Sequence, residues 1–168
     1  IQPLNPFFRY FAQHLAEQIT RFPFALIIAF FFFIFNPESI WIPNLGILFL
    51  SIISTFLSFL IQFLLQSIIA CLCFWTEKAS SIERLLFIPT LFLSGLLAPV
   101  ATFPEYVKSW IYLTPFPYLI DFPANLLSGN ATNITRGFIM QILWIILFFP
   151  IFKNSWSAGT KKYTAMGS

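Results

Sequence analysis

Few residues of this chain could do acid–base or nucleophilic chemistry, and they are scattered along it. The sole histidine, His14, is far along the chain from Ser94, the serine that precedes Gly95. A hydrolase working inside a membrane would need a serine or an acid pair with a base at the same depth. The sequence also contains no metal-ligand cluster and no glycine-rich phosphate loop. We therefore expect that the chain is not itself an enzyme and that it holds no metal or cofactor.

A stripe of uncharged polar residues follows one face of a long apolar segment. At about 100° per residue its members share an arc of roughly 80°; they are Ser51, Thr55, Ser58, Gln62 and Gln66. Ser54 lies just beside this arc. The stripe could line a conduction path, or it could hold the helix to its neighbours by hydrogen bonds of about 0.6 kcal/mol each. We favour the packing role, because these side chains carry no charge.

Asp121 is an acid between two apolar neighbours, Ile120 and Phe122. Such a carboxylate could bind a cation of the substrate or pair with Lys108 or Arg136. If it lies at the wet interface, it is simply solvated. We favour the solvated interpretation at this stage.

The composition indicates a membrane protein. Of the 168 residues, 58% are hydrophobic and 9% are charged, whereas soluble domains carry about 25% charged residues. A soluble core of this size could not hide so much apolar surface, so the bilayer is the expected solvent. The chain starts at Ile1 rather than at Met, and we interpret it as the C-terminal part of a longer protein.

The predicted fold class is an all-α integral membrane protein with about four transmembrane helices, an N-terminal amphipathic interfacial helix and a short external re-entrant helical hairpin. We expect one membrane domain over residues 1–168. Its predicted parts are an interfacial helix (1–21), four spans (22–35, 45–74, 85–100 and 137–152), an external hairpin (101–135) and a polar tail (153–168).

The positions of the cations predict the orientation. With four spans, both termini and the loop at 75–84 lie on one side of the membrane, and most cations lie there with them: Arg9, Arg21, Lys78, Arg84, Lys153, Lys161 and Lys162. Only Lys108 and Arg136 fall on the other side. Because loops rich in Lys and Arg stay in the cytoplasm, we expect a plasma-membrane protein with both termini cytoplasmic and the hairpin outside.

Prolines at positions 99, 104, 115 and 117 interrupt the hairpin region. Pro104 suits the first turn of one short helix, and 117–128 is predicted as a second one that ends at Gly129. Two short helices between two spans can form a hairpin that dips into the outer leaflet, against protein or water. They can also form an ordinary loop in the headgroups, and the sequence leaves both alternatives open.

The segment FLSGLLAPVATFPEYVKSWIYLTPFPYLIDFPANLLSG resembles the signature region of ABC-2 type permeases. The resemblance rests on Ser94-Gly95, Pro99 and Phe103-Pro104, followed by a proline-rich segment. The start IQPLNPFFRY and the end SAGTKKYTAMGS are similar to the uncharacterised bacterial ABC-2 branch. The resemblance covers most of the chain, although its motifs are loose.

The resemblance implies a six-span permease of which these would be the last four spans. It implies that two permease subunits pair as a homo- or heterodimer, embedded in lipid, and that a separate ATP-binding-cassette ATPase dimer, which binds ATP and magnesium, drives export. It implies no nucleic-acid partner. The external helices would form a lid over the exit path, with Ser94, Gly95, Pro99, Phe103, Pro104 and Asp121 as candidate gate residues.

Candidate contacts with the ATPase lie on the predicted cytoplasmic side: Arg9, His14, Glu17, Glu77, Lys78 and Arg84. The alternative is that the first three belong to a helix resting on lipid headgroups and that the others belong to a solvated loop. Two other functions remain as alternatives to transport: a structural or assembly subunit and, less favoured, an intramembrane enzyme. An ATPase gene in the same operon would favour the transporter.

Overall fold

A computed structural model describes residues 6–39, 42–76 and 79–166. The described residues form helices, turns and bends without strands, which confirms the predicted all-α class. They belong to two compact units, Ile1–Ile42 and Pro43–Ser168, and each unit is described here by itself. The expectation of one membrane domain stays a prediction.

The first unit is one long helix, α1 (Pro6–Phe35), followed by the short 3-10 helix η1 (Pro37–Ser39). We expected an interfacial helix to end near Arg21 and a separate span to start at residue 22. Instead α1 continues through Pro23 without a break. A proline removes one backbone hydrogen bond, and membrane helices tolerate this loss because local adjustments satisfy the freed carbonyl.

The second unit contains the remaining elements. In chain order they are α2 (Leu45–Cys71), η2 (Leu72–Phe74), α3 (Ala79–Leu93), η3 (Val100–Thr102), α4 (Glu105–Ile111), η4 (Phe116–Tyr118), α5 (Asp121–Leu127) and α6 (Ile134–Met166). Asn44 starts α2 by accepting the Gly46 N–H at its side-chain oxygen. At the other end of the unit's sequence, α6 passes through Pro150 without a break.

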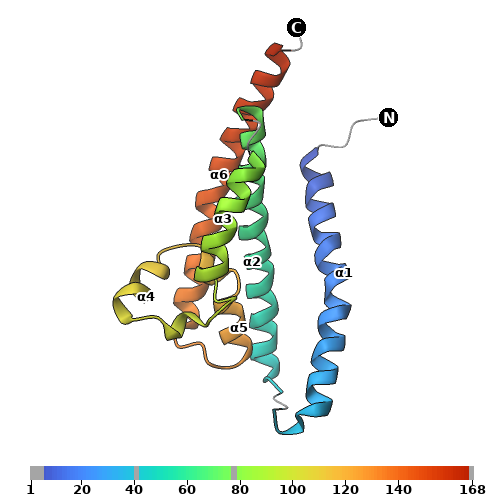
Figure 1. The fold of residues 1–168 in the computed structure, drawn as a ribbon, viewed down its shortest axis with the longest axis vertical. Coiled ribbons are helices and arrows are strands. Elements are labelled where there is room, and N and C mark those ends of the chain that lie inside the picture. The colour runs from blue at the N-terminus through green and yellow to red at the C-terminus, as the bar shows by residue number, and fades with distance from the viewer. Residues whose placement is uncertain (1–5, 40–41, 77–78, 167–168) are drawn as a thin grey trace. The chain divides into compact units, whose positions relative to one another are not determined.

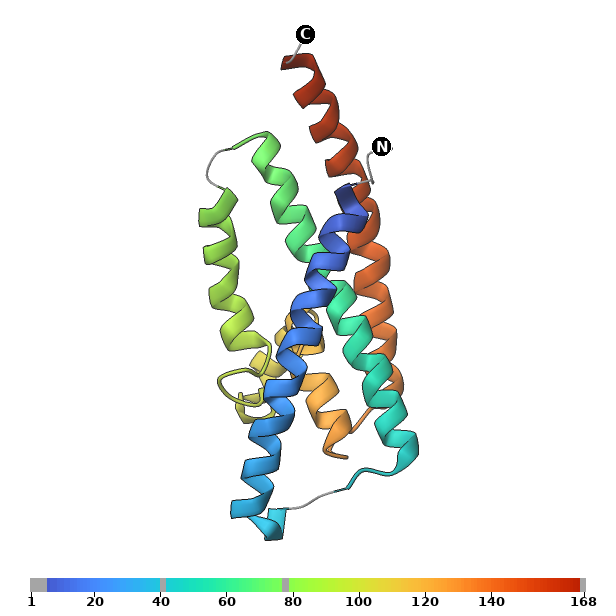
Figure 2. The same cartoon turned by 90° about the vertical axis from the view of Figure 1, so that its right-hand side faces the viewer.

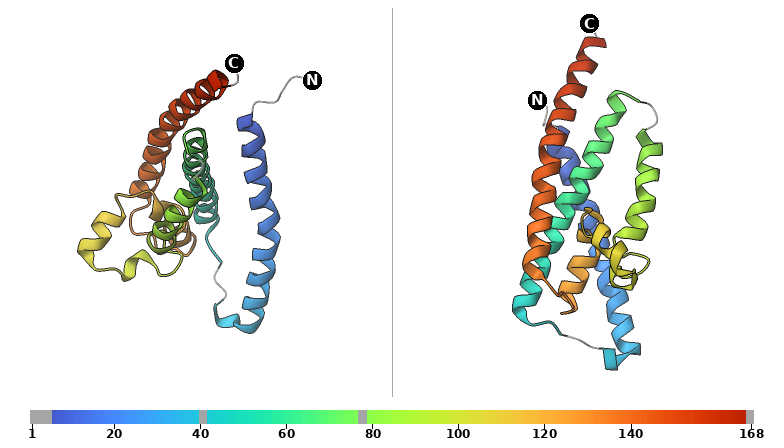
Figure 3. Two further views of the ribbon diagram at one scale, coloured as in Figure 1. Left: turned by 45° about the horizontal axis from the view of Figure 1, so that its top comes forward. Right: turned by 90° about the vertical axis from the view of Figure 1, so that its left-hand side faces the viewer.

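Within this unit α2 and α6 lie side by side and run in the same direction, while α3 runs the opposite way (Figures 1 and 2). The segment that holds α4 and α5 gathers at one end of the unit, and the far end of α6 projects at the other (Figure 3). The core includes Ile61 of α2, Leu126 of α5 and Phe148 of α6, all buried. The hairpin segment is thus packed on the two long helices.

Large apolar side chains also cover the outside of α2 and α6, among them Phe49, Ile52, Ile139 and Ile146. A water-soluble unit would bury such side chains, whereas lipid is as apolar as they are. Their exposure fits a surface that faces the bilayer. The fold is therefore that of an all-α membrane protein.

Three helices in the described part of the chain are long and apolar enough to cross a membrane: Phe8–Phe35, Leu45–Phe74 and Ile134–Lys162. The expected span at 85–100 differs, because α3 starts earlier and ends at Leu93. Its 15 residues measure only about 22 Å, less than the roughly 30 Å of bilayer hydrocarbon. The expected polar tail also differs, because α6 continues through it as a helix to Met166.

Candidate functional site

The hairpin segment contains two short helices in the described structure, with bounds that differ from the prediction. Pro104 is the N-cap of α4 rather than its first residue. The second predicted helix, 117–128, is divided into η4 and α5. Gly129, with φ of +75°, follows α5; its N–H donates to the Leu126 carbonyl at 3.1 Å and the Asn130 N–H donates to the Asn125 carbonyl at 2.9 Å. These bonds are the Schellman motif that a glycine at this position favours.

Asp121 holds the loop that follows α3 at two points. Its N–H donates to the Ser94 carbonyl at 2.9 Å, and its Oδ1 accepts the Val100 N–H at 3.1 Å. Ser94 and Val100 flank the bends between α3 and η3 and are both fully buried. One residue of α5 therefore fixes both ends of this loop, and we call this arrangement the Asp121 clasp.

Gly95 makes the clasp sterically possible. Its φ of +86° lies in the left-handed region, which glycine adopts without the steric cost that a Cβ brings. A Cβ at this position would also stand 2.8 Å from the Asp121 Cβ. The side chain that lies against Gly95, one of the candidate gate residues, is therefore that of Asp121.

The expectation that Asp121 is solvated was wrong, because only 6% of the residue is exposed. Burial raises the pKa of its carboxyl, and the bonds from the Val100 N–H and the Asn125 side chain oppose that shift. Lys108, one of the ion-pair partners considered, instead pairs with Glu105 at 2.8 Å. The carboxylate thus has mainly uncharged hydrogen-bond donors around it.

A second polar group ties the hairpin to the long helices. The side-chain nitrogen of Gln141, on α6, donates to the Ser54 carbonyl at 3.0 Å, to the Ser58 Oγ at 2.9 Å and to the Tyr118 carbonyl at 3.1 Å. The Ser54 Oγ donates to the Gln141 Oε1 at 3.2 Å, and the Ser58 Oγ lies 2.7 Å from the Tyr118 carbonyl. We call these four residues the Gln141 network; it joins α2, α6 and η4.

The Gln141 network is shielded from its surroundings. Gln141 and Ser54 have no exposed surface, Ser58 is 5% exposed and Tyr118 is 3% exposed. The Tyr118 hydroxyl donates to the Tyr112 carbonyl at 2.8 Å, so this residue is held at both its side chain and its backbone. A buried network whose members are paired fixes one arrangement of the elements that it joins.

The first turns of α5 and α6 meet at a glycine. A Cβ at Gly137 would overlap the ring of Phe122. The same ring meets Phe138 edge-on, with centroids 5.6 Å apart, and Tyr118 at 6.3 Å. Gly137 thus provides the space in which an aromatic side chain of the hairpin is seated against α6.

The structure brings together some of the predicted gate residues and leaves others apart. Ser94, Gly95 and Asp121 meet at the clasp, and Pro99 precedes the Val100 N–H that completes it. The Ser94 Oγ is buried without a hydrogen-bond partner. Phe103 and Pro104 lie beyond η3, where they end that helix and begin α4. The gate role of all six stays a prediction.

The outer side of α4 carries exposed aromatic residues. Tyr106 is 75% exposed and Trp110 is 74% exposed, while Ile111 on the same helix is buried. Tyr and Trp are the side chains that favour the membrane–water interface. This surface is compatible with contact to the headgroups, and both alternatives from the sequence stay predictions.

The predicted polar stripe on α2 is only partly buried. Ser51 and Ser58 are buried, Gln62 and Gln66 are half-buried and Thr55 is exposed. The Ser51 Oγ donates to the Ile47 carbonyl and the Thr55 Oγ1 to the Ser51 carbonyl, both within α2. Ser58 and its neighbour Ser54 reach another helix. The bonds of Ser58 and Ser54 to Gln141 and Tyr118 are of the packing kind, and the role of the stripe as a whole stays a prediction.

The candidate ATPase contacts are spread over both units. On α1, Arg9 and Glu17 are exposed and His14 is half-buried, and Glu17 lies 3.7 Å from Arg21. Arg84 is exposed on α3. Glu77 and Lys78 lie outside the described residues. These positions leave the contact role of the six residues a prediction.

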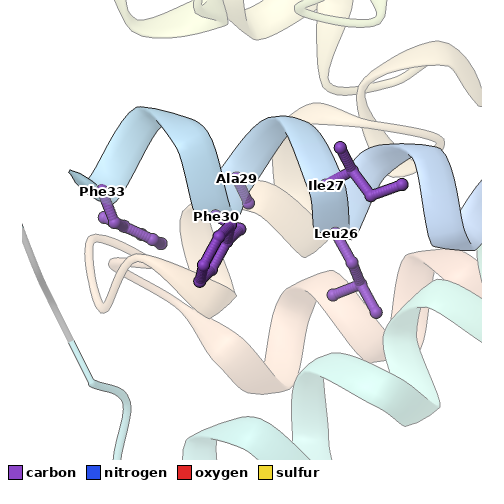
Figure 4. A pocket seen from close by; sticks show the side chains of 5 residues that line it. All are labelled: Leu26, Ile27, Ala29, Phe30 and Phe33. Carbon is purple, nitrogen blue, oxygen red and sulfur yellow. The ribbon is translucent and has the colours of Figure 1, made fainter. Parts of the chain in front are cut away.

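A hollow on α1 is lined by Leu26, Ile27, Ala29, Phe30 and Phe33 (Figure 4). A site for a polar ligand needs a few placed polar groups, and this lining is aliphatic and aromatic throughout. In the part of the chain that the structure describes, no group of three or more His, Cys, Asp or Glu side chains could hold a metal ion. The polar groups that organise this protein are those of the clasp and the Gln141 network.

A family model described as ABC-2 family transporter protein matches residues 1–167. The chain belongs to the ABC-2 transporter family. No curated protein and no solved structure matches it. Membership of this family makes the chain the membrane component of a transporter. The match confirms the resemblance found in its sequence.

Sequence reasoning missed the residue that organises the hairpin contact, Gln141. The signal was present, because Gln141 is the one polar side chain between Gly137 and Trp144. A lone amide in an apolar span marks a site of interhelical hydrogen bonding. Its partners could not be found from the sequence, since Ser54 is 87 positions away.

Proposed function

We propose that this ABC-2 permease moves its substrate out of the cell as part of an ATP-driven exporter. Two permease subunits form the pathway, and a separate pair of ATP-binding-cassette ATPases, which bind ATP and magnesium, powers it from the cytoplasm. The observation that carries the proposal is the family match over nearly the whole chain. The three long apolar helices support it, because a pathway across a bilayer needs such helices.

The proposed orientation places both termini in the cytoplasm and the hairpin outside, in the plasma membrane. The distribution of cations supports it. In the second unit, the start of α3 and the far half of α6 lie at one end, and α4 lies toward the other (Figure 1). Arg84 belongs to α3, Lys153, Lys161 and Lys162 belong to the far half of α6, and Lys108 belongs to α4. Cytoplasmic ends of membrane proteins carry the excess of Lys and Arg.

In the proposed mechanism the hairpin is the outward gate. Movement at the cytoplasmic end is carried along α2 and α6, because regular helices transmit displacement along their length. The Gln141 network spans both helices and η4, so a shift of one helix against the other would change bonds at the hairpin. The Asp121 clasp keeps the loop after α3 in register with α5 during this movement.

Co-purification of the full-length protein tests the proposal. The tagged permease, solubilised in mild detergent, is expected to retain an ATP-binding-cassette ATPase and a second permease subunit. ATP hydrolysis by the retained ATPase is expected to depend on the permease. A permease that is stable and monodisperse but retains no ATPase would instead favour the structural or assembly role.

A further inference from the structure

Residues 152–162 of α6 have two different faces. The exposed positions recur in pairs every four residues, which places them on one side of the helix. They are Lys153, Asn154, Ser157, Ala158, Lys161 and Lys162, and we call them the lysine face. On the other side, Phe152 and Gly159 are buried and Trp156 is half-buried.

The inner side of this extension is fixed to the end of α2. A Cβ at Gly159 would overlap the Phe74 ring of η2. The same ring meets Trp156 edge-on at 6.0 Å between centroids, and Trp156 lies 6.2 Å from Phe152. Aromatic contacts of this kind are each worth about 0.5–1.5 kcal/mol beyond burial. The lysine face is therefore presented by a packed helix rather than by a loose tail.

The extension is longer than the membrane requires. The 33 residues of α6 measure about 50 Å, and even a tilt of about 40° leaves roughly 38 Å along the membrane normal, against about 30 Å of hydrocarbon. The apolar run ends at Phe152, which places Lys153 at the hydrocarbon edge. Lys162 is a further 14 Å or so along the helix, beyond the headgroup layer of roughly 5–8 Å.

The charge of the extension has one sign. Between Ile134 and Met166 the sequence has four basic residues, Arg136, Lys153, Lys161 and Lys162, and no Asp or Glu. The first turns of α3, which belong to the same end of the unit (Figure 3), add no net charge, because the exposed Arg84 is next to the exposed Glu83. A cationic helix surface is complementary to an acidic protein surface, and the two lysines at its far end, Lys161 and Lys162, stand beyond the headgroup layer.

We propose that the lysine face docks on an acidic surface of the partner ATPase. The inference rests on the proposed function and adds to it the part of the permease that would bind the ATPase. Through Phe74 and Gly159, the docked extension is linked directly to the end of α2. Through the length of α6 it is linked to Gln141 and the hairpin.

Cross-linking from the middle of the lysine face tests this docking in the full-length complex. Ala158→Cys is combined with Cys73→Ser, because Cys73 is exposed and Cys71 is buried. The matched control is Ser128→Cys, which is exposed on the hairpin. A photo-activated thiol cross-linker is expected to join the ATPase to position 158 and not to position 128. Adducts at 158 that contain only lipid, or only a second permease, would overturn the inference.

Variants of the lysine charges test the docking separately from the proposed exporter function. Lys161→Glu with Lys162→Glu is expected to weaken ATPase binding about three- to tenfold at low salt, and the two Arg variants to preserve it. The difference should vanish near 1 M salt, where the Debye length is about 3 Å. Equal ATPase binding by the Glu variants contradicts the docking alone. Failure of the unsubstituted protein to bind ATPase contradicts the docking together with the proposed function.

Discussion

The Asp121 side chain lies directly against Gly95, so that a Cβ on residue 95 would stand 2.8 Å from the Asp121 Cβ and 3.0 Å from its Oδ1. Gly95 is the second residue after α3, and Asp121 is the first residue of α5. Their contact closes the loop between them into one packed segment. The clasp can therefore be tested by variants on either side of this contact.

Gly95→Ala is expected to destabilise the protein by about 1–3 kcal/mol, because alanine is strained at positive φ and its methyl group meets Asp121. Thermal unfolding in detergent, followed by tryptophan fluorescence, measures the loss. Gly46→Ala is the control, since nothing lies within 4 Å of a Cβ at Gly46. Equal stability of the two variants would show that the clasp is not closely packed.

Asp121→Ala is expected to cost more stability than Asp121→Asn. The alanine variant leaves the buried Val100 N–H without an acceptor, which costs about 1–3 kcal/mol. The asparagine variant retains an oxygen where Oδ1 stands. Denaturant unfolding of both variants gives the difference directly. If Asp121→Asn lowers the unfolding free energy as much as Asp121→Ala does, the assigned hydrogen bond from the Val100 N–H is contradicted.

The same residue predicts a dependence of stability on pH. Burial raises the pKa of the Asp121 carboxyl, so the folded state holds its proton more tightly than the unfolded chain does. The stability that protonation contributes is complete below the ordinary range of a carboxyl pKa. It is lost as pH rises through the raised pKa of the folded state. Asp121→Asn is expected to remove this decline, and an unchanged pH profile would count against the assignment.

Gln141→Leu is expected to cost about 1–3 kcal/mol and to loosen the hairpin, because the amide bonds to Ser54, Ser58 and Tyr118 are lost together. Amide hydrogen exchange over residues 112–128 should rise. Gln66→Leu is the matched control, a half-buried glutamine on α2 with the same chemical change. Similar exchange in both variants would mean that the Gln141 network does not hold the hairpin.

Phe74 and Gly159 are expected to be energetically coupled. Gly159→Ala places a methyl group where the Phe74 ring lies, so it should destabilise the native protein. In a Phe74→Ala background the same change fills vacated space and should cost about 1–3 kcal/mol less. A double-mutant cycle on unfolding free energies measures this coupling. If the two substitutions change the unfolding free energy additively, the Phe74 ring does not lie against Gly159.

The sequence was informative where structure depends on local patterns. The charge-free run at 45–74 predicted the helical segment that forms α2 and η2 closely, and the prolines predicted two short helices in the hairpin. Pro23 was less informative, because a membrane helix can continue through a proline. The helical end of α6 was missed, because large apolar residues are sparse between 153 and 166, where they are Trp156, Tyr163 and Met166.

The site depended on contacts that no local pattern contains. Asp121 was expected to be solvated, and it is buried in contact with Ser94, Gly95 and Val100, which precede it by more than twenty positions. Gln141 stands out by composition alone, whereas its partners belong to α2 and η4. The polar stripe on α2 was predicted from the sequence without Ser54, which was placed beside it. In the structure Ser54 is one of the two α2 residues that form hydrogen bonds with Gln141.

The central claim is that the hairpin lies outside the cell and the end of α6 lies inside. Two single cysteines in a Cys73→Ser background, Ser109→Cys on α4 and Ser157→Cys on α6, test it because both positions are exposed. With a membrane-impermeant thiol reagent, we expect labelling at 109 in intact cells and labelling at 157 only after the cells are permeabilised. Labelling at 157 in intact cells with protection at 109 would contradict the account.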